Sequence, residues 1–409
     1  MVSAGPPRNG TAVGTEDTTE LLESARRGDE RAYLELVESH RSELHAHCYR
    51  ILASVHDADD AVQDVLVRAW RGLPRFEGRS SLRTWLFKIA TNVALDAVRR
   101  RSRRETPIEH GPPAALGGPP GDAVLEDIWI EPYPGRGPFD AATASPEARY
   151  ERRESLELAF VAALQHLAPQ QRAVLVLREV LGFPASDVAG ILDTSVPAVN
   201  SALQRARSSI RSRLPGRSQH DELRALGDRR VARLAADYAD AIERADVPRL
   251  LSMLTEDATW AMPPAPGWYR GHDAIAEFHT TYVNSQRWRH LPTWANGQLA
   301  IGCYMLEVGA SYRGAVIDVL TLERGRIAAV MAFLVTEAAD RPAGSYRGFT
   351  SAELFGRFGL PSELPLGDPS GCWPYGAAGP EAAVGPEAAA EPDPAGPPAG
   401  DSPEKPAAR

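Results

Sequence analysis

The chain has 409 residues, 45 Lys and Arg against 54 Asp and Glu, a formal net charge of −9 and 43% hydrophobic residues. This length predicts two to four domains, and the composition is that of an ordinary soluble protein with compact cores. Three scattered cysteines, Cys48, Cys303 and Cys372, exclude a disulfide framework and form no zinc-ligand pattern. The sequence shows neither an apolar leader nor an apolar run of about 18 residues, so we expect a cytoplasmic protein with no membrane span.

Charge is distributed unevenly along the first half of the chain. Residues 19–74 carry 7 basic against 11 acidic residues, whereas residues 75–104 carry 9 against 2 and residues 170–217 carry 7 against 3. Two basic segments within an acidic chain indicate contacts with nucleic-acid phosphates rather than a general solubilising surface.

Helical periodicity begins at Thr19, after 17 residues rich in Gly, Thr and Pro that we expect to be disordered. Three helices follow, and the third, residues 57–70, has an apolar stripe opposite a polar one. Carboxylates on a solvated helix face are more typical of a protein-docking surface than of a metal site, so we expect no metal. His45, His47 and Cys48 do not share one helix face, so we interpret them as residues next to the core. The polar stripe of the third helix carries Asp59, Asp60, Gln63, Asp64 and Arg68.

A basic loop and a long helix are expected over residues 75–104. Aromatic and cationic side chains alternate there, which suits melted or single-stranded nucleic acid because bases stack on rings while cations hold phosphates. The alternative is that Trp85 and Phe87 are core residues. The candidate nucleic-acid residues are Arg79, Ser80, Arg83, Trp85, Lys88 and Asn92.

Residues 106–146 are rich in Pro and Gly, as is typical of a linker. A plain tether has no need of large aromatic residues, yet this one carries Trp129 and Tyr133 close to prolines. We therefore expect these two side chains to dock against another part of the protein.

Residues 184–207 form the strongest local pattern, two short helices around a three-residue turn, with Ser195 placed to cap the second helix. This spacing fits a helix-turn-helix, whose second helix enters the major groove. An ordinary helical hairpin with a polar outer face is the alternative. The outward residues of the second helix, which suit base edges and phosphates, are Asn200, Ser201, Gln204, Arg205 and Arg207.

The character of the sequence changes after residue 229. Amphipathic helices lead into a run of strand patterns, which predicts an α+β unit with helices packed on one face of a curved antiparallel sheet. A final segment of mainly Ala, Pro, Gly and Glu is expected to be disordered. The expected strands are residues 257–262, 294–302, 304–312, 315–322 and 326–336, with a hairpin turn at 323–325.

Together the N-terminal motifs resemble a bacterial sigma-70 family factor of the extracytoplasmic-function (ECF) group. Residues 57–65 with Arg68-Ala69-Trp70 are similar to the region 2 helix that grips the clamp helices of RNA polymerase. Residues 75–92 are similar to the part that melts and reads the −10 element. Residues 167–172 and 199–207 are similar to region 4, which reads the −35 element. The resemblance implies an alternative sigma factor whose partners are promoter DNA and the clamp helices and flap of the polymerase core.

The second half resembles the members of this group that carry a C-terminal SnoaL-like domain, the mycobacterial sigma-G type among them. The matching segments are residues 129–134, 262–264, 268–271 and 358–361. The resemblance implies a SnoaL-like (NTF2-like) cone that controls the sigma factor in cis, without a dedicated anti-sigma partner.

The expected fold is therefore multidomain, with two all-α sigma domains followed by an α+β cone. The expected parts are residues 1–17 (disordered), 18–105 (region 2 helical bundle), 106–146 (linker), 147–216 (region 4 helix-turn-helix), 225–340 (SnoaL-like domain), 341–368 (C-terminal extension) and 369–409 (disordered tail).

Related cones include isomerases and cyclases, which need an acid or base deep in an apolar cup. Asp257, His272 and Asp318 are candidates, but each also has an ordinary structural explanation. We expect no catalysis and no cofactor, and two alternatives stay open, a ligand-sensing cup and a helix-turn-helix regulator fused to a small-molecule-binding or isomerase-like domain. A cup for a small ligand would be lined by Trp260, Met262, Trp268, Tyr269 and Phe278.

Overall fold

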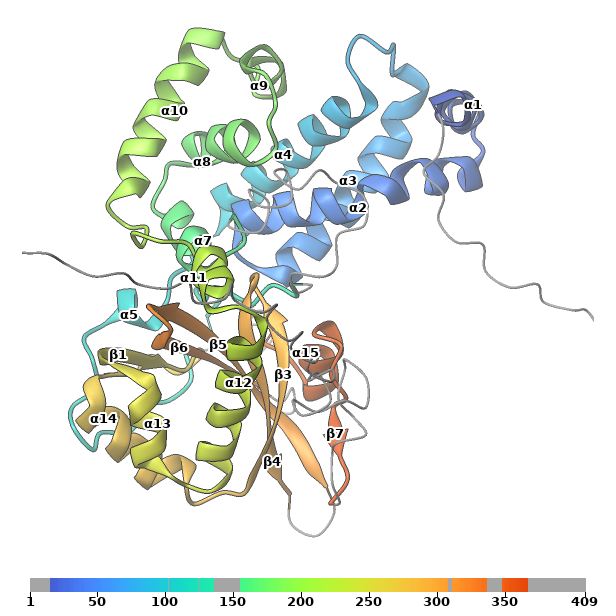
Figure 1. The fold of residues 1–409 in the computed structure, drawn as a ribbon. Helices are drawn as coiled ribbons and strands as arrows, with labels where there is room; N and C mark the ends of the chain where they lie inside the picture. Colours follow the sequence, from blue (N-terminus) through green and yellow to red (C-terminus); the bar gives the residue numbers. More distant parts are fainter. Residues whose placement is uncertain are drawn as a thin grey trace, which may run out of the picture.

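The computed structural model describes residues 15–101, 103–124, 126–135, 155–307, 311–336 and 348–366. A helical part lies above a mixed α/β part, and the segment after α4 runs down from the first to the second (Figure 1). Residues 1–14 and 369–409, which were predicted to be disordered, lie outside the described residues. The predicted boundary between the linker and region 4, at residues 146 and 147, also lies outside them. Among the described residues, no helix has the length and apolarity needed to cross a membrane.

Region 2 is a bundle in which three helices share one core. Asp29, Ser54 and Ser81 each cap the following helix by accepting a hydrogen bond from a backbone N–H of its first turn. The first helix begins inside the segment predicted to be disordered. The elements are α1 (Thr15–Arg26), α2 (Glu30–Leu52), α3 (Val55–Gly72), the short helix η1 (Leu73–Arg75) and α4 (Leu82–Arg100).

Region 4 contains the predicted helix-turn-helix. Ser195 caps its second helix, as predicted, by accepting a hydrogen bond from the Ala198 N–H at 3.4 Å, and the inward side chains Val199, Leu203 and Ala206 are buried. The elements are α7 (Leu158–Gln165), α8 (Pro169–Leu175), the π-helical turn η2 (Val176–Val180), α9 (Ala185–Ile191) and α10 (Val196–Arg211).

The C-terminal part is a curved seven-stranded sheet with the order β2-β1-β6-β5-β4-β3, and β7 pairs with β5. The helices α12, α13 and α14 lie over one face (Figure 1). Its helices are the short α5 (Pro107–His110) of the linker, then α11 (Gln219–Leu226), α12 (Asp228–Glu243), α13 (Val247–Met253), α14 (Gly271–Phe278) with the π-helical turn η3 (His279–Val283), and α15 (Ser351–Arg357). Its strands are β1 (Leu254–Ala261), β2 (Trp268–Arg270), β3 (Trp288–Ala295), β4 (Gln298–Leu306), β5 (Tyr312–Glu323), β6 (Arg326–Leu334) and β7 (Glu363–Leu364).

Two details of this sheet differ from the sequence-based expectation. First, β1 pairs with β6 in parallel, so the sheet is mixed rather than antiparallel. Second, the face opposite α12 is also covered, because Phe355 of α15 packs there and one apolar cluster continues from the helical part to Ile317 and Val319 of β5. The cone therefore shares a core with the helical part.

The strands predicted at 294–302 and 304–312 have the wrong bounds, because β4 runs from Gln298 to Leu306 and β5 begins at Tyr312. A hairpin turn interrupts the first of them at Asn296-Gly297, where both residues have positive φ angles of 54° and 70°. Asn-Gly is the strongest short hairpin signal, since both residues tolerate this conformation. The strand before the turn mixes polar and apolar residues without a clear alternation, so its pattern did not indicate a separate strand. The hairpin predicted at residues 323–325 is confirmed.

Candidate nucleic-acid and protein interfaces

Four of the five polar residues predicted on α3 are exposed, namely Asp60, Gln63, Asp64 and Arg68. The fifth, Asp59, is half-buried because Arg357 of α15 donates a hydrogen bond to it at 2.8 Å and His45 contacts it at 3.0 Å. Burial alone would raise the pKa of Asp59, but these two partners outweigh it and lower the pKa to about 2. The C-terminal extension therefore engages the acidic face of region 2.

The start of α3 is held by the linker. The buried carboxylate of Glu131 accepts hydrogen bonds from the Val55 N–H at 2.7 Å, the Ser54 hydroxyl at 2.9 Å and the His56 N–H at 3.2 Å. Burial would raise the pKa of Glu131, but its hydrogen bonds with His56 and the charge of Arg104 lower it to about 2. An anion at a helix N-terminus is favourable, so Glu131 anchors the linker to region 2.

The six residues predicted to contact nucleic acid on and before α4 lie in different surroundings. Arg79 and Ser80 are exposed in the preceding loop, and Asn92 is half-buried. Trp85 is also half-buried and packs on Phe76 with ring centroids 5.0 Å apart.

The other two, Arg83 and Lys88, contact region 4. Lys88 donates hydrogen bonds to Asp193 at 2.6 Å and to the Gly190 carbonyl at 2.9 Å, both in the helix-turn-helix. Arg83 pairs with Glu43 at 2.7 Å and lies 4.4 Å from the ring centre of Phe183. One edge of the predicted −10 surface is therefore covered by region 4.

The outer face of α10 is exposed. All five predicted residues, Asn200, Ser201, Gln204, Arg205 and Arg207, are accessible to solvent, and Arg207 forms a surface ion pair with Glu179 at 2.5 Å. This face is chemically suited to base edges and phosphates.

The two linker aromatics dock at different places. Trp129 is fully buried, and its indole N–H donates to the Val124 carbonyl at 2.9 Å within the linker. Tyr133 packs on Tyr49 of α2 with ring centroids 4.4 Å apart, and its hydroxyl contacts His45 at 3.0 Å.

The tip of the β3–β4 hairpin joins the cone to region 2, to the linker and to the start of region 4. The Asn296 amide donates hydrogen bonds to the Tyr49 hydroxyl of region 2 at 2.9 Å and to the Leu156 carbonyl before α7 at 2.8 Å. Its side-chain oxygen accepts from the Tyr133 N–H of the linker at 2.9 Å. Because Asn296 is fully buried, each of these bonds must be made in the folded state.

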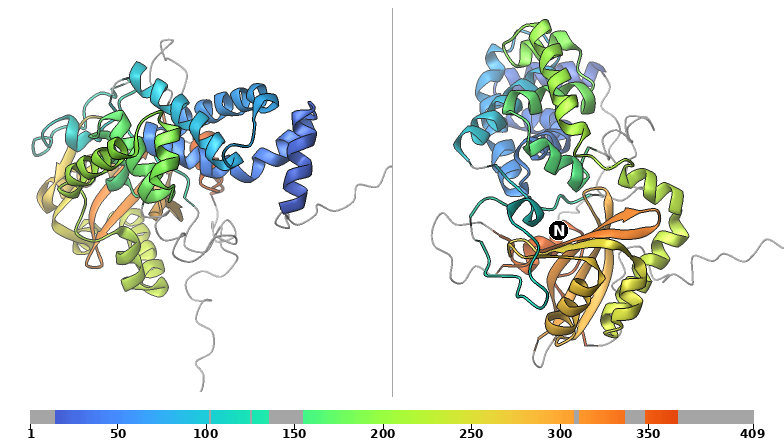
Figure 2. Two further views of the ribbon diagram at one scale, coloured as in Figure 1. Left: turned by 90° about the horizontal axis from the view of Figure 1, so that it is seen from above. Right: turned by 90° about the vertical axis from the view of Figure 1, so that its left-hand side faces the viewer.

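The aromatic residues predicted to line a cup are all buried in the cone. Trp260 packs against His279 at 4.5 Å and Tyr269 stacks on Phe278 at 4.6 Å, while Met262 joins the same apolar cluster. Trp268 donates its indole N–H to the Gly111 carbonyl of the linker, which runs along this side of the sheet (Figure 2).

The three candidate acids and bases of the cone are not brought together. Asp318 is buried and accepts hydrogen bonds from the Tyr238 hydroxyl at 2.8 Å and the Cys303 thiol at 3.2 Å, and burial raises its pKa. Asp257 is exposed on β1, and His272 contacts the Thr255 carbonyl at 3.0 Å.

No group of three or more His, Cys, Asp or Glu residues that could hold a metal occurs in the part of the chain that the structure describes. His47 is buried with its Nε2 3.0 Å from the Thr91 hydroxyl, and burial lowers its pKa to about 3. It is therefore a neutral core histidine, as the sequence suggested.

Sequence reasoning missed the residues that join the domains. Asn296 was detectable from its Asn-Gly dipeptide, and Glu131 from its position between Trp129 and Tyr133. Arg357 and Asp193 carry no local signal, because only the tertiary fold brings them to Asp59 and Lys88.

Comparison with known families accounts for the whole arrangement. The model of sigma-70 region 2 matches residues 36–104, that of sigma-70 region 4 matches residues 157–210, and that of the SnoaL-like domain matches residues 235–330. These matches define a sigma factor with an appended SnoaL-like domain.

The chain is 42% identical to the ECF RNA polymerase sigma factor SigG of Mycobacterium tuberculosis over 348 residues, which cover 83% of this chain and 86% of the relative. It is 30% identical to the RNA polymerase sigma-H factor of Pseudomonas aeruginosa over 48% of this chain and 92% of that protein. Among solved structures, the ECF sigma factor SigJ of Mycobacterium tuberculosis aligns at 21% identity and a TM-score of 0.48, covering 74% of this chain and 96% of that one.

The chain belongs to the ECF sigma factor family. It is an alternative sigma factor, a protein that binds RNA polymerase core and directs transcription initiation at promoters. Sigma factors are not enzymes.

Proposed function

We propose that the SnoaL-like domain regulates this sigma factor in cis, as a non-catalytic clamp that holds regions 2 and 4 closed until core polymerase binds. The names −10 and −35 place the two promoter elements about 25 base pairs apart, which is about 85 Å along DNA. Regions 2 and 4 touch directly in the structure, with Lys88 Nζ and Asp193 Oδ1 2.6 Å apart. A sigma factor in this state does not reach both elements, so transcription requires it to open.

In this proposal the surfaces have separate tasks. The acidic face of α3 binds the polymerase clamp helices, the loop before α4 and the exposed side of α4 read the −10 element, and α10 reads the −35 element, while region 4 also meets the flap. Residues 18–105 and 147–216 form the two sigma domains, residues 106–146 the linker, residues 225–340 the regulatory cone and residues 341–368 its extension.

The observation that carries the proposal is the Asn296 junction. One side chain from the cone bonds region 2, the linker and the start of region 4, so these parts separate only if buried hydrogen bonds are broken. The contact between Arg357 and Asp59 adds a second link, this time to the predicted polymerase-binding face. Opening of the clamp and binding of the core are therefore coupled.

Two features of the cone support a structural rather than a catalytic role. Its aromatic residues fill the interior by packing on one another, and Asp318 already has two hydrogen-bond partners. The other two candidate groups lie elsewhere on the cone. A general acid or base must lie within hydrogen-bond reach of its substrate, whereas the buried Asp318 accepts hydrogen bonds from Tyr238 and Cys303 of its own core.

Point variants of the full chain test the proposal. Asn296→Ala and Arg357→Ala should each raise core binding and promoter-directed transcription, by about fivefold or more for Asn296→Ala, since a buried hydrogen-bond network is worth roughly 1–3 kcal/mol. Truncation after Pro215 should act in the same direction. Arg230→Ala, an exposed change on α12, is the control and should leave both quantities unchanged. If the Asn296 and Arg357 variants lower transcription or leave it unaltered while remaining folded, the clamp is not inhibitory.

A further inference from the structure

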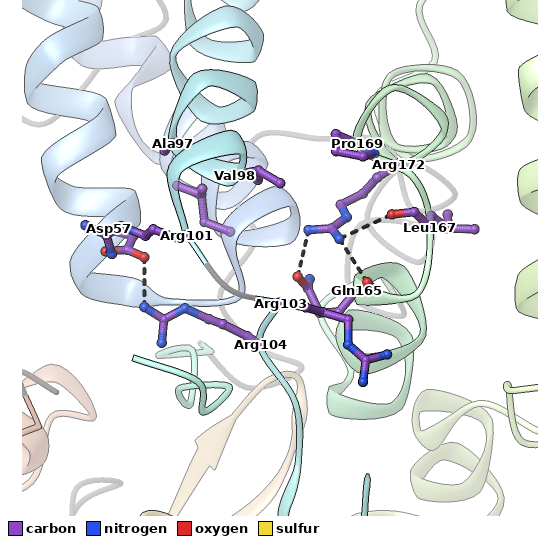
Figure 3. A pocket seen from close by; sticks show the side chains of 11 residues that line it. Asp57, Ala97, Val98, Arg101, Arg103, Arg104, Gln165, Leu167, Pro169 and Arg172 are labelled. Carbon is purple, nitrogen blue, oxygen red and sulfur yellow. Dashed lines mark hydrogen bonds and ion pairs between the residues drawn. The ribbon is translucent and has the colours of Figure 1, made fainter. Parts of the chain in front are cut away.

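A cavity of about 240 Å³ lies between the two sigma domains (Figure 3). The end of α4 and the residues after it form one side, and the turn from α7 to α8 forms the other. Figure 3 shows Asp57 and Arg104 on the first side and Gln165 and Arg172 on the second. The charged and polar residues that line the cavity are Asp57, Arg101, Arg103, Arg104, Gln165 and Arg172.

Three of the four arginines around the cavity have carboxylate partners. Arg101 and Arg104 both pair with Asp57, the latter at 2.8 Å. Arg103 pairs with Glu105 at 3.3 Å and contacts His166 at 2.7 Å. The positive charge of these three side chains is thus partly balanced.

Arg172 differs from the other three. It is only 4% exposed, and both of its terminal nitrogens donate to neutral oxygens. Nη1 donates to the Ile51 carbonyl at 2.5 Å and the Gln165 side-chain oxygen at 2.7 Å, and Nη2 donates to the carbonyls of Gln165 and Leu167 at 3.1 and 3.4 Å. Among the described residues it makes no ion pair, and its Nε has no hydrogen-bond partner. Burial and then the like charge of Arg103 lower its pKa to about 10. A buried guanidinium beside another cation is costly unless an anion accompanies it.

We propose that this cavity binds a small phosphate anion of the pyrophosphate type, free or as the end of a nucleotide, held by Arg172 together with Arg101 and Arg103. The guanidinium groups of Arg101 and Arg103 match phosphate oxygens in charge and in the fork geometry of their N–H groups. Arg172 adds its positive charge and an Nε–H that has no hydrogen-bond partner among the described residues. The volume equals that of roughly eight liquid water molecules and falls below the range of about 300–1,000 Å³ typical of drug-sized ligands. This size suits one or two phosphoryl groups.

A small anion fits the geometry better than a DNA backbone. Arg172 is buried between two domains in contact, where a duplex has no access. The proposed ligands come from both sigma domains, with Arg101 and Arg103 at the end of region 2 and Arg172 in region 4. A bound anion would therefore stabilise the closed arrangement by a free energy that grows with the logarithm of its concentration above the dissociation constant.

The test uses the full chain in a buffer without phosphate. Inorganic pyrophosphate should bind saturably with one site per chain by titration calorimetry and should raise the melting temperature. Arg172→Gln and Arg103→Gln should each weaken this binding roughly tenfold or more, the scale of a lost charge-assisted hydrogen bond. Arg99→Gln is the matched control, because Arg99 lies in the last turn of α4, close in sequence to Arg101 and Arg103. Its side chain is 62% exposed and pairs with Asp96 outside the cavity.

Arg103→Gln keeps the test decisive if Arg172→Gln fails to fold, since Arg103 has a side chain 43% exposed. A second titration uses nucleoside diphosphates in place of pyrophosphate at the same ionic strength. Tighter binding of the nucleotide than of pyrophosphate identifies a nucleotide end as the ligand, and equal binding identifies the inorganic group. Absence of saturable binding in both titrations overturns the proposal. Equal affinity in the Arg99, Arg103 and Arg172 variants, or variants that alter only DNA affinity, would also overturn it.

Discussion

Regions 2 and 4 differ in how far the rest of the chain engages their functional surfaces. In region 2, the first turn of α3 receives Glu131 of the linker, Asp59 receives Arg357 of the C-terminal extension, and Lys88 of α4 is paired with Asp193. In region 4, α10 is capped by its own Ser195 and its outward residues are exposed. In the proposed mechanism, control therefore acts on region 2, while the helix proposed to read the −35 element is exposed.

The largest expected effect concerns the polymerase-binding face of region 2. The double change Asp60→Arg, Asp64→Arg should weaken core binding by more than about 100-fold, because each reversed charge at an interface costs several kcal/mol. Both residues are exposed, so helical content measured by circular dichroism should not change. Glu38→Arg on α2 serves as the control. Unaltered affinity for core polymerase in a fluorescence titration would remove α3 from the interface.

The second effect tests whether region 2 depends on the linker. The pKa of Glu131 is lowered from 4.5 to about 2, so its folded-state contribution is fully present above pH 4.5 and is lost as the pH falls towards 2. Glu131→Gln should remove on the order of 3 kcal/mol of unfolding free energy at neutral pH and flatten the pH dependence of stability between those limits. Denaturant unfolding at several pH values measures both. Identical pH profiles in the variant and the parent would show that Glu131 does not anchor α3.

The third effect concerns region 4 alone. Gln204→Ala and Arg205→Ala should weaken binding to a −35 duplex by roughly 1–3 kcal/mol if the side chain reads a base edge, with relaxed specificity at one position. A phosphate contact would instead weaken all sequences alike and reduce the salt dependence. Because α10 is exposed, we expect these losses in the free protein, before core binds. Gel-shift titrations at moderate salt that show no loss would contradict the recognition-helix assignment.

The smallest effect concerns the ion pair between Lys88 and Asp193, whose two members are replaced one at a time. Lys88 is 38% exposed and Asp193 74% exposed, so their pairing contributes about 0–1 kcal/mol. Asp193→Ala removes the carboxylate partner of Lys88 and leaves only its hydrogen bond to the Gly190 carbonyl, so it should raise affinity for melted −10 DNA by up to about fivefold, whereas Lys88→Ala should lower it. Changes of the same sign in both variants would mean that the pair does not cover a DNA-binding surface.

Much of the fold was predictable from the sequence because its information is local. The helix-turn-helix follows from Ser195 and the apolar spacing of α10, and the acidic face of α3 follows from helical periodicity. The β3–β4 hairpin was missed since the strand before Asn296-Gly297 mixes polar and apolar residues without a clear alternation. The contacts of Arg357 and Asp193 join residues 298 and 105 positions apart, and no pattern within either segment encodes them.

The central claim is that the appended domain holds regions 2 and 4 together, and single-molecule energy transfer between them tests it most directly. Ser39→Cys on α2 and Ser208→Cys on α10 place dyes on exposed positions, with Cys372→Ser removing a competing thiol while Cys48 and Cys303 are buried. We expect one high-transfer population in the free protein, a shift to low transfer with core polymerase and promoter DNA, and a partial shift in Asn296→Ala without them. Low transfer in the free parent protein, or an unchanged distribution in Asn296→Ala, would contradict the account.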